Sequence, residues 1–507
     1  MKNMLSVICL TVALCAITPT CMAEGNVDLL KHIRVPVEPG PGDDPWGPVP
    51  DTKGTSIVNA SPGLLSFYNS GRAFGIPGTV TGDFWERTQV TGDWGGCRTM
   101  LAQKGVFFDL YTTSGYQRVA SGGYQKSDSF MQNAQLSLNI DTARAGLWSG
   151  GLIHLTGQAR FGSLGDKTGA AGTYAPIYTG KLYPDLMLDN DVDLTEFFLL
   201  QSITPEFSVV LGRISTVFMP DATFFGNSYK YYFSNFNFNK NPMTTNTYGP
   251  VSLSMLLQWA PTDWLQLIGG ICDANGKANN LGRDAFDALN YYFQATATYR
   301  IGGLPGQFLG AWNWSNKKLV NFSRPLGVVT PGAMVPVREA LLSGKREKTN
   351  LAEKKASWIL IGSLAQWLYT CDDEATIAMK QRSSLPLRGI GVFGRFGYAP
   401  PENNRVTADA SATIFAHGMI PKRPNDTIGV GYFYNKFSGD LKDRFQELNG
   451  TNLRDESGVE AFYDFALTPA VHLTTSYQYI KNPFEAQTKA RFSRHASVFS
   501  VRLGIDW

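Results

Sequence analysis

The chain has 507 residues, of which 17% are charged and 12% aromatic, and its formal net charge is +3. Soluble domains average about 25% charged residues, so charge is scarce, as in a wall that faces lipid or in a large soluble β protein. The near-neutral balance argues against nucleic-acid binding. After the first 23 residues no run of 18 apolar residues occurs, so the sequence predicts no membrane-spanning helix there.

Residues 1–23 have the features of a secretory signal peptide. Lys2 gives a positive start, Met4 to Ile17 form an apolar stretch, and Ala23 ends a small-residue cleavage site. Removal of Lys2 lowers the net charge from +3 to +2. We therefore predict an exported protein.

Residues 24–89 form the second predicted segment. They are rich in Pro and Gly, especially over 31–63, and this composition predicts an extended tether rather than a packed domain. We expect this segment in the periplasm. A short helix is predicted over 98–104, ended by Gly105.

From residue 106 onward the pattern is one of strand after strand. Sixteen strands are predicted, at about 106–118, 130–142, 150–162, 192–203, 206–217, 250–260, 264–273, 290–302, 306–316, 356–371, 387–399, 406–418, 426–438, 457–467, 470–482 and 495–507.

The last strand alternates without a break. One face carries Phe499, Val501, Leu503, Ile505 and Trp507, and the other carries Val498, Ser500, Arg502, Gly504 and Asp506. An apolar face with aromatic residues at the end of the chain is typical of the closing strand of an outer-membrane barrel.

The predicted connections also alternate in length. Tight turns fall at 204–205, 261–263, 303–305 and 468–469, and long loops at about 163–191, 218–249, 274–289, 317–355 and 439–456. Short turns at one end and long loops at the other are typical of bacterial outer-membrane barrels. The exception is 372–386, long and charged on the short-turn side, so either this region protrudes there or a nearby strand is misplaced.

These patterns predict an all-β fold over residues 90–507, preceded by a short N-terminal helical or irregular segment. The fold expected is a transmembrane antiparallel up-and-down β-barrel of about 16 strands in the outer membrane of a Gram-negative bacterium. A barrel of this size encloses an aqueous channel, whereas about eight strands are filled by side chains.

Two stretches resemble the OprB-type carbohydrate-selective porins. The first is Thr91-Gly92-Asp93-Trp94-Gly95-Gly96-Cys97-Arg98-Thr99-Met100-Leu101 with Gly105; the second is Glu460, Tyr463, Pro469, Leu473, Tyr477-Gln478-Tyr479-Ile480 and Asn482-Pro483. Between them, Gly212-Arg213 and Phe224-Phe225-Gly226-Asn227 match a Gly-Arg strand end and an aromatic loop of that family.

The resemblance spans roughly residues 90–507, with insertions around 317–355. It implies a sixteen-stranded porin through which monosaccharides such as glucose, or polyols, diffuse along a weakly binding channel. The Asp93-Trp94-Gly95-Gly96 run precedes the barrel, and we expect it to seat the short helix against the rim.

A sugar-selective channel needs polar groups for hydroxyls and aromatic faces for C–H patches, with binding weak enough for release. The alternation points the following charged candidates inward: Asp109, Asp141, Arg160, Glu196, Arg300, Arg395, Glu460, Asp464 and Arg502. Arg213 joins them only if its strand slips after Val210. The alternative is that these residues only solvate the inner wall.

The loop after the fifth strand is rich in aromatic residues. It either folds into the lumen and narrows it, or packs on itself outside or within an aromatic girdle. Its candidate constriction residues are Phe224, Phe225, Tyr231 and Tyr232.

Several alternatives remain open from the sequence. They are a non-selective porin, a structural barrel without transport and, with less support, a secreted glycoside or lipid hydrolase, since no Gly-x-Ser-x-Gly or His-Glu-x-x-His motif occurs. A ligand-gated importer with a plug domain would need about 22 strands, more than the sixteen predicted here. We predict no catalytic activity, no cofactor, no metal and no nucleic acid; the expected partners are sugars, outer-membrane lipid and lipopolysaccharide, and the barrel-assembly machinery through the C-terminal strand.

Overall fold

The computed structural model describes residues 79–162, 168–175, 191–216, 231–247, 249, 251–276, 285–345, 349–382, 386–488 and 493–507. The predicted signal peptide and most of the predicted segment 24–89 lie outside the described residues.

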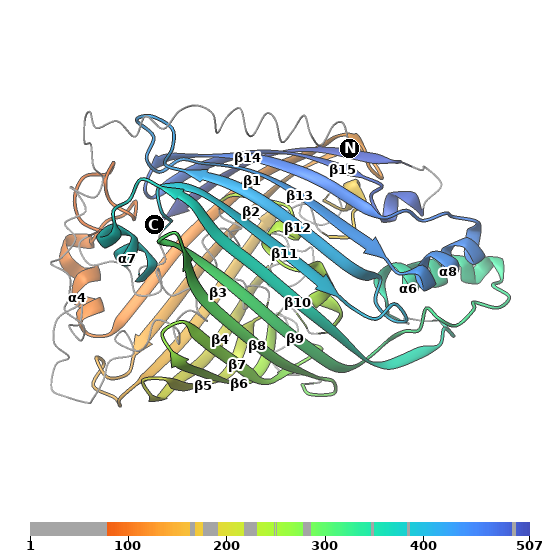
Figure 1. The fold of residues 1–507 in the computed structure, drawn as a ribbon, viewed down its shortest axis with the longest axis horizontal. Coiled ribbons are helices and arrows are strands. Elements are labelled where there is room, and N and C mark those ends of the chain that lie inside the picture. The colour runs from red at the N-terminus through yellow and green to blue at the C-terminus, as the bar shows by residue number, and fades with distance from the viewer. Residues whose placement is uncertain are drawn as a thin grey trace.

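In the described part of the chain, sixteen strands form one closed antiparallel sheet in sequence order, with β1 paired to β16. Figure 1 shows the strands tilted around a barrel. The strands are β1 Val106–Gly122, β2 Ser127–Asp141, β3 Gly151–Gly162, β4 Asp191–Thr204, β5 Phe207–Ser215, β6 Val251–Thr262, β7 Leu265–Asp273, β8 Leu289–Ile301, β9 Leu304–Val320, β10 Glu353–Thr370, β11 Gly389–Tyr398, β12 Val406–His417, β13 Thr427–Phe437, β14 Glu456–Thr468, β15 Val471–Lys481 and β16 His495–Asp506. All sixteen predicted strands and their order along the chain are confirmed.

The strands expose one face and bury the other. In β16, Phe499 is 43% exposed, whereas Val498 and Arg502 on the opposite face are 0% and 1% exposed. The same alternation runs through β13 and β14. Because the exposed face carries large apolar side chains around the barrel, it is the lipid-facing side, and the buried polar face lines the interior.

The helices lie at the two ends of the barrel or inside it. They are η3 Trp94–Gly96, α4 Cys97–Gln103, η4 Thr168–Ala171, α5 Phe236–Asn239, η6 Pro242–Asn246, η7 Pro331–Ala333, α6 Met334–Ser343, α7 Glu374–Arg382, α8 Gly439–Asn449 and η8 Glu485–Gln487. The helix predicted over 98–104 is α4. Among the described residues, no helix has the length and hydropathy needed to cross a membrane.

The connection 372–386 lies at the short-turn end and contains α7. Figure 1 shows α7 at the same end of the barrel as α4 and the C-terminus, and α6 with α8 at the other. The strands on both sides are where they were predicted, so this connection protrudes at the short-turn end. Ile377 packs in an apolar cluster with Leu387 and Phe393, and Lys380 pairs with Asp372 at 2.8 Å.

The long-loop end carries a packed cap. Helices α6 and α8 lie side by side there, and Leu341, Leu441 and Phe445 are fully buried between the loops. Ser438 caps α8 by accepting from the Leu441 amide. The insertion 317–355 therefore builds part of a folded cap.

The Gly-Asp-Trp-Gly-Gly motif begins α4. Trp94, Gly95 and Gly96 have φ of 51°, 67° and 95°, the left-handed region that glycine adopts without a steric penalty. The Asp93 carboxylate accepts from the Thr99 amide at 2.8 Å and from its hydroxyl at 2.9 Å. The glycines thus allow the tight turn that lets Asp93 hold the first turn of the helix.

Arg98 links α4 to the first strand of the barrel and to the residue that follows the last strand. Its guanidinium lies over the rings of Phe108 and Trp94, at 4.5 and 5.2 Å from their centres, and donates to the Trp507 carbonyl at 2.9 Å. Burial lowers the pKa of Arg98, and the charges of Asp109 and Asp93 oppose that shift. The expected structural role of the motif at the rim is confirmed, and it lies at the β1–β16 junction.

Candidate functional site

The loop between β5 and β6 enters the barrel. Its described part, 231–247, has every described side chain buried except that of Tyr232, which is half-buried. α5 contacts β12 and β13, and η6 contacts β10 and β12. Of the two courses left open by the sequence, the described part takes the inward one. We call residues 231–247 the interior loop.

Asparagine side chains shape the interior loop locally. Asn235 caps α5 by accepting from the Asn237 amide at 3.0 Å, and Asn241 caps η6 by accepting from the Met243 amide at 3.0 Å. Asn239 donates to the Phe233 carbonyl at 2.9 Å. Asparagine favours such turns because its short amide reaches the backbone two residues on.

One buried carboxylate anchors the start of the loop. Glu460 on β14 accepts from the Ser234 amide at 2.8 Å, the Ser234 hydroxyl at 2.7 Å and the Asn235 amide at 2.9 Å. Gln478 on β15 donates to the Ser234 hydroxyl at 2.7 Å, and its side-chain oxygen accepts from the side-chain amide of Asn235 at 2.9 Å. Three donors converge on this one carboxyl group, and hydrogen bonds to a carboxylate are stronger than those to a neutral acceptor.

Two arginines hold the loop backbone. Arg502 on β16 donates to the Tyr232 carbonyl, and Arg395 on β11 donates to the Phe238 carbonyl. Both side chains are almost completely buried. Arg502 also interacts electrostatically with Glu460 and Asp464.

The loop's aromatic side chains pack against the same wall. Phe233 lies 4.7 Å from Phe462 and 5.4 Å from Phe415, ring centre to ring centre, and Phe238 lies 5.8 Å from Phe433. A Cβ on Gly431 would lie 2.6 Å from the Phe238 ring, so the wall needs glycine there to admit it. The loop thus fits a surface shaped for it.

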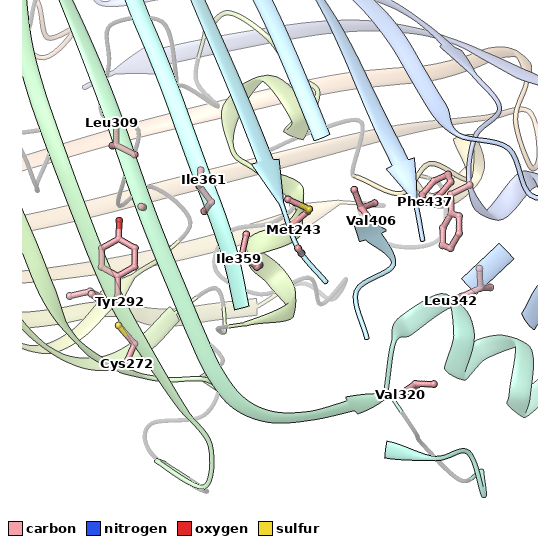
Figure 2. Packing of buried hydrophobic residues seen from close by; sticks show 14 of the residues in the cluster. Met243, Cys272, Tyr292, Leu309, Val320, Leu342, Ile359, Ile361, Val406 and Phe437 are labelled. Atoms are coloured by element: carbon pink, nitrogen blue, oxygen red, sulfur yellow. The ribbon is translucent and has the colours of Figure 1, made fainter. Parts of the chain in front are cut away.

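The far end of the loop reaches other strands. Asn241 donates to Asp409 on β12 at 2.8 Å. Figure 2 shows Met243 beside Ile359 and Ile361 of β10, within the buried apolar cluster. The interior loop therefore lines the wall from β16 round to β10.

The next part of the inner wall, β1–β4, adjoins the wall that the interior loop lines, because β1 pairs with β16. It carries a network of neutral polar groups. Gln135 accepts from the Tyr111 hydroxyl at 2.7 Å and from Gln158 at 2.6 Å. Ser137 and Thr156 are 3.0 Å apart, oxygen to oxygen, and Thr156 lies 2.7 Å from His154 Nε2. Hydroxyl and amide groups of this kind match the groups that a neutral polyol presents.

Two pairs that each join a basic side chain to a carboxyl group border this network. Glu196 on β4 lies 3.6 Å from His154 Nε2 and accepts from the Ser215 amide at 2.9 Å. Arg160 lies 3.4 Å from Asp193. The Glu196 side chain is 14% exposed, against 0% for the whole Glu460 residue, so the two carboxylates sit in different surroundings.

The predicted site residues fall into groups. Arg395, Glu460 and Arg502 hold the interior loop, and Asp464 on the same wall accepts from His472 at 2.8 Å and Thr474 at 2.7 Å. Arg160 and Glu196 lie by the β1–β4 network. Tyr231 donates to Asp506 at 2.5 Å, and Tyr232 lies 5.7 Å from the Phe462 ring.

The remaining candidates are at the short-turn end or beside an irregularity. Asp109 lies near Arg98, Asp141 accepts from the Ala143 and Arg144 amides, and Arg300 lies 3.4 Å from Glu374 of α7. Arg213 is 2% exposed and follows Gly212, whose φ of 136° interrupts the alternation. Phe224 and Phe225 lie outside the described residues. Whether any of the predicted residues contacts a solute stays a prediction.

Several residues of this site were missed by the sequence interpretation. Ser234, Asn235, Asp409, Gln478 and Asp506 all hold the interior loop. The recurrence of asparagine at 235, 237, 239 and 241 was the available signal, because it marks a run of turns inside an aromatic loop. No His, Cys, Asp and Glu group suited to a metal ion occurs among the described residues.

A closed sixteen-stranded barrel with a loop folded inside it is the architecture of outer-membrane porins. Among solved structures, the high-pH structure of Pseudomonas putida OprB matches with a TM-score of 0.67 and 18% identity, over 83% of this chain and 98% of that one. The low-pH structure of the same protein gives a TM-score of 0.49 and 15% identity, with the same shares covered. Pseudomonas aeruginosa OccK11 gives 0.39 and 8%, over 79% of this chain and 95% of that one.

The family model described as carbohydrate-selective porin, OprB family, matches residues 125–506. The chain therefore belongs to the OprB family of porins, a family of outer-membrane channels, as its resemblance implied. A search of curated protein sequences gives no significant match.

Proposed function

We propose that this protein is a diffusion channel for neutral carbohydrates, namely monosaccharides such as glucose, or polyols. The observation that carries the proposal is the match of the carbohydrate-selective porin model to residues 125–506. The interior loop along one wall and a hydroxyl and amide network on the other support it, because a sugar needs polar partners without a strong net charge.

The orientation follows from the loops. We place the long-loop end, with α6 and α8, outside the cell and the short-turn end, with α4 and α7, in the periplasm. The predicted signal peptide, residues 1–23, takes the chain across the inner membrane, and the segment 24–89 remains periplasmic. The strand β16 closes the barrel against β1, and we propose it as the segment that the barrel-assembly machinery recognises.

Two of the predicted residues are assigned here to the solute. Arg160, 3.4 Å from Asp193, and Glu196, 14% exposed, lie beside the hydroxyl and amide network of β1–β4. A guanidinium donates to sugar hydroxyls and a carboxylate accepts from them. Arg395, Glu460 and Arg502 serve the channel differently, by holding the interior loop that narrows it.

Liposome swelling with the purified, refolded protein tests this function. Glucose is compared with an amino acid of similar size, a disaccharide and a charged sugar acid. We expect glucose to enter faster than the amino acid, and Arg160→Gln and Glu196→Gln to reduce that preference. Arg300→Gln, whose side chain is 41% exposed at the short-turn end, is the matched control and should leave it unchanged.

Equal entry of glucose and the amino acid would instead indicate a non-selective porin. An absence of swelling from a folded, heat-modifiable barrel would indicate a structural barrel without transport.

A further inference from the structure

The outer face of the barrel repeats one short pattern on two strands. β13 carries Tyr432, Tyr434 and Lys436 at alternate positions, and β15 carries Tyr477, Tyr479 and Lys481 in the same way. The four tyrosines are between 37% and 49% exposed, whereas the residues between them are buried. Both Tyr-x-Tyr-x-Lys patterns therefore point outward, toward lipid.

The two lysines lie at the same end of their strands. Lys481 is the last residue of β15 and Lys436 the last but one of β13, so both are at the long-loop end. Tyrosine rings favour the boundary between acyl chains and headgroups. The lysines are therefore placed one step beyond that boundary, at the level of the headgroups.

The register sets the distance between the lysines. Ser457 on β14 pairs with both Tyr434 and Lys481, so Lys481 lies in the same cross-strand row as Tyr434. Lys436 is two residues further along β13. With strands about 4.8 Å apart and a rise of about 3.4 Å per residue, the two lysine Cα atoms are roughly 12 Å apart. Two long, flexible side chains at this separation can reach one headgroup together.

Neither lysine is neutralised within the described part of the protein: no ion pair joins Lys436 or Lys481 to a carboxylate. One carboxylate near the lysines, Asp455, accepts from Lys442 at 2.7 Å and from the Tyr434 hydroxyl at 2.7 Å. Burial alone would raise the pKa of Asp455, but these bonds and one from the Phe437 amide hold it below its usual value. Asp455 is thus ionised but already paired.

A third basic group completes the surface. His495 on β16 lies directly opposite Lys481, and its ring stacks on Tyr479 with centres 6.0 Å apart. Lysines near an anionic lipid surface each favour binding, and the effect falls off within a Debye length. Exposed aromatic rings below and unpaired cations above match an amphipathic, anionic ligand.

We propose that Lys436 and Lys481, with the four tyrosines beneath them, form a binding site for the phosphorylated headgroup of an outer-leaflet glycolipid, lipopolysaccharide. The site rests on the orientation given under the proposed function, and it gives a role to the Tyr477-Gln478-Tyr479-Ile480 motif. The phosphates bind the two ammonium groups, and the acyl chains lie along the tyrosine rings.

The test titrates the purified barrel, in detergent without divalent cations, with diphosphoryl lipid A. The readout is the midpoint of heat modification. We expect the lipid to raise the midpoint in the wild type, and Lys436→Gln/Lys481→Gln to need about tenfold more lipid for the same rise. The control, Lys104→Gln/Lys422→Gln, removes the same charge at the short-turn end and should titrate like the wild type.

Equal titration of the double variant and its control would overturn the proposal. So would an equal rise with lipid A stripped of its phosphates, or with inorganic phosphate alone. The double variant should keep the wild-type midpoint without lipid and admit glucose normally. A barrel that binds lipid A but fails to admit glucose would defeat the proposed function and leave the lipid site standing.

Discussion

The two sides of the inner wall use polar residues in different ways. On β11–β16, Arg395, Glu460 and Arg502 are almost completely buried and their hydrogen bonds go to the interior loop. On β1–β4, Gln135, Ser137 and Thr156 bond to their neighbours on the same wall. Charge on an inner wall therefore does not by itself mark a solute site, because charge-assisted bonds also hold a loop in place.

The strongest test of this comparison is Glu460→Gln. A neutral amide of the same size cannot accept from all three donors of Ser234 and Asn235, and it adds a donor of its own. We expect a loss of roughly 3 kcal/mol in the free energy of unfolding and a larger, noisier single-channel conductance. Chemical unfolding in micelles and planar-bilayer recording measure the two effects. Glu374→Gln, at a side chain 89% exposed, should change neither, and an unaltered stability for Glu460→Gln would contradict the anchoring role.

Gly431→Ala tests the shape of the same wall. Its new Cβ would lie 2.6 Å from the Phe238 ring, so the loop must shift to admit it. We expect a loss of about 1–3 kcal/mol from overpacking, measured by chemical unfolding. Gly394→Ala on β11 is the matched control, since the atom nearest its Cβ would be the Ser411 carbonyl oxygen, at an ordinary 3.4 Å. Equal losses in the two variants would show that the loop does not depend on close contact at Gly431.

Thr156→Val tests the polar network of β1–β4 and has the smallest expected effect of the three substitutions. The substitution removes a hydroxyl that lies 3.0 Å from Ser137 and 2.7 Å from His154 but keeps the side-chain shape. We expect about 1 kcal/mol of destabilisation, unchanged conductance and slower glucose entry in liposome swelling. A loss as large as that of Glu460→Gln would make the β1–β4 network as structural as the loop anchors.

Much of the fold was predictable from local patterns. Period-two alternation fixes both the presence of a strand and the face on which a residue such as Arg502 or Glu460 lies, so sixteen strands and their inward charges followed from sequence. The partner of an inward charge was not predictable. Ser234 and Glu460 are 226 residues apart, and no local signal joins them.

Irregular positions were also beyond the pattern. Arg213 follows Gly212 at a φ of 136°, and the sequence shows the glycine but not the conformation it adopts. α7 was predictable only as an overlong connection, because its packing through Ile377 depends on side chains from β10, β11 and β12.

The central claim is that the interior loop is held by one wall while the solute is served by the other. Planar-bilayer recording of Glu460→Gln and Glu196→Gln side by side, with glucose added in steps, tests it most directly. We predict that Glu460→Gln gives a larger and noisier single-channel conductance than the wild type. Glu196→Gln should keep the wild-type conductance and weaken the block of the current by glucose. A steady, wild-type conductance in Glu460→Gln together with a lost glucose block would contradict the account, because it would place the solute on Glu460.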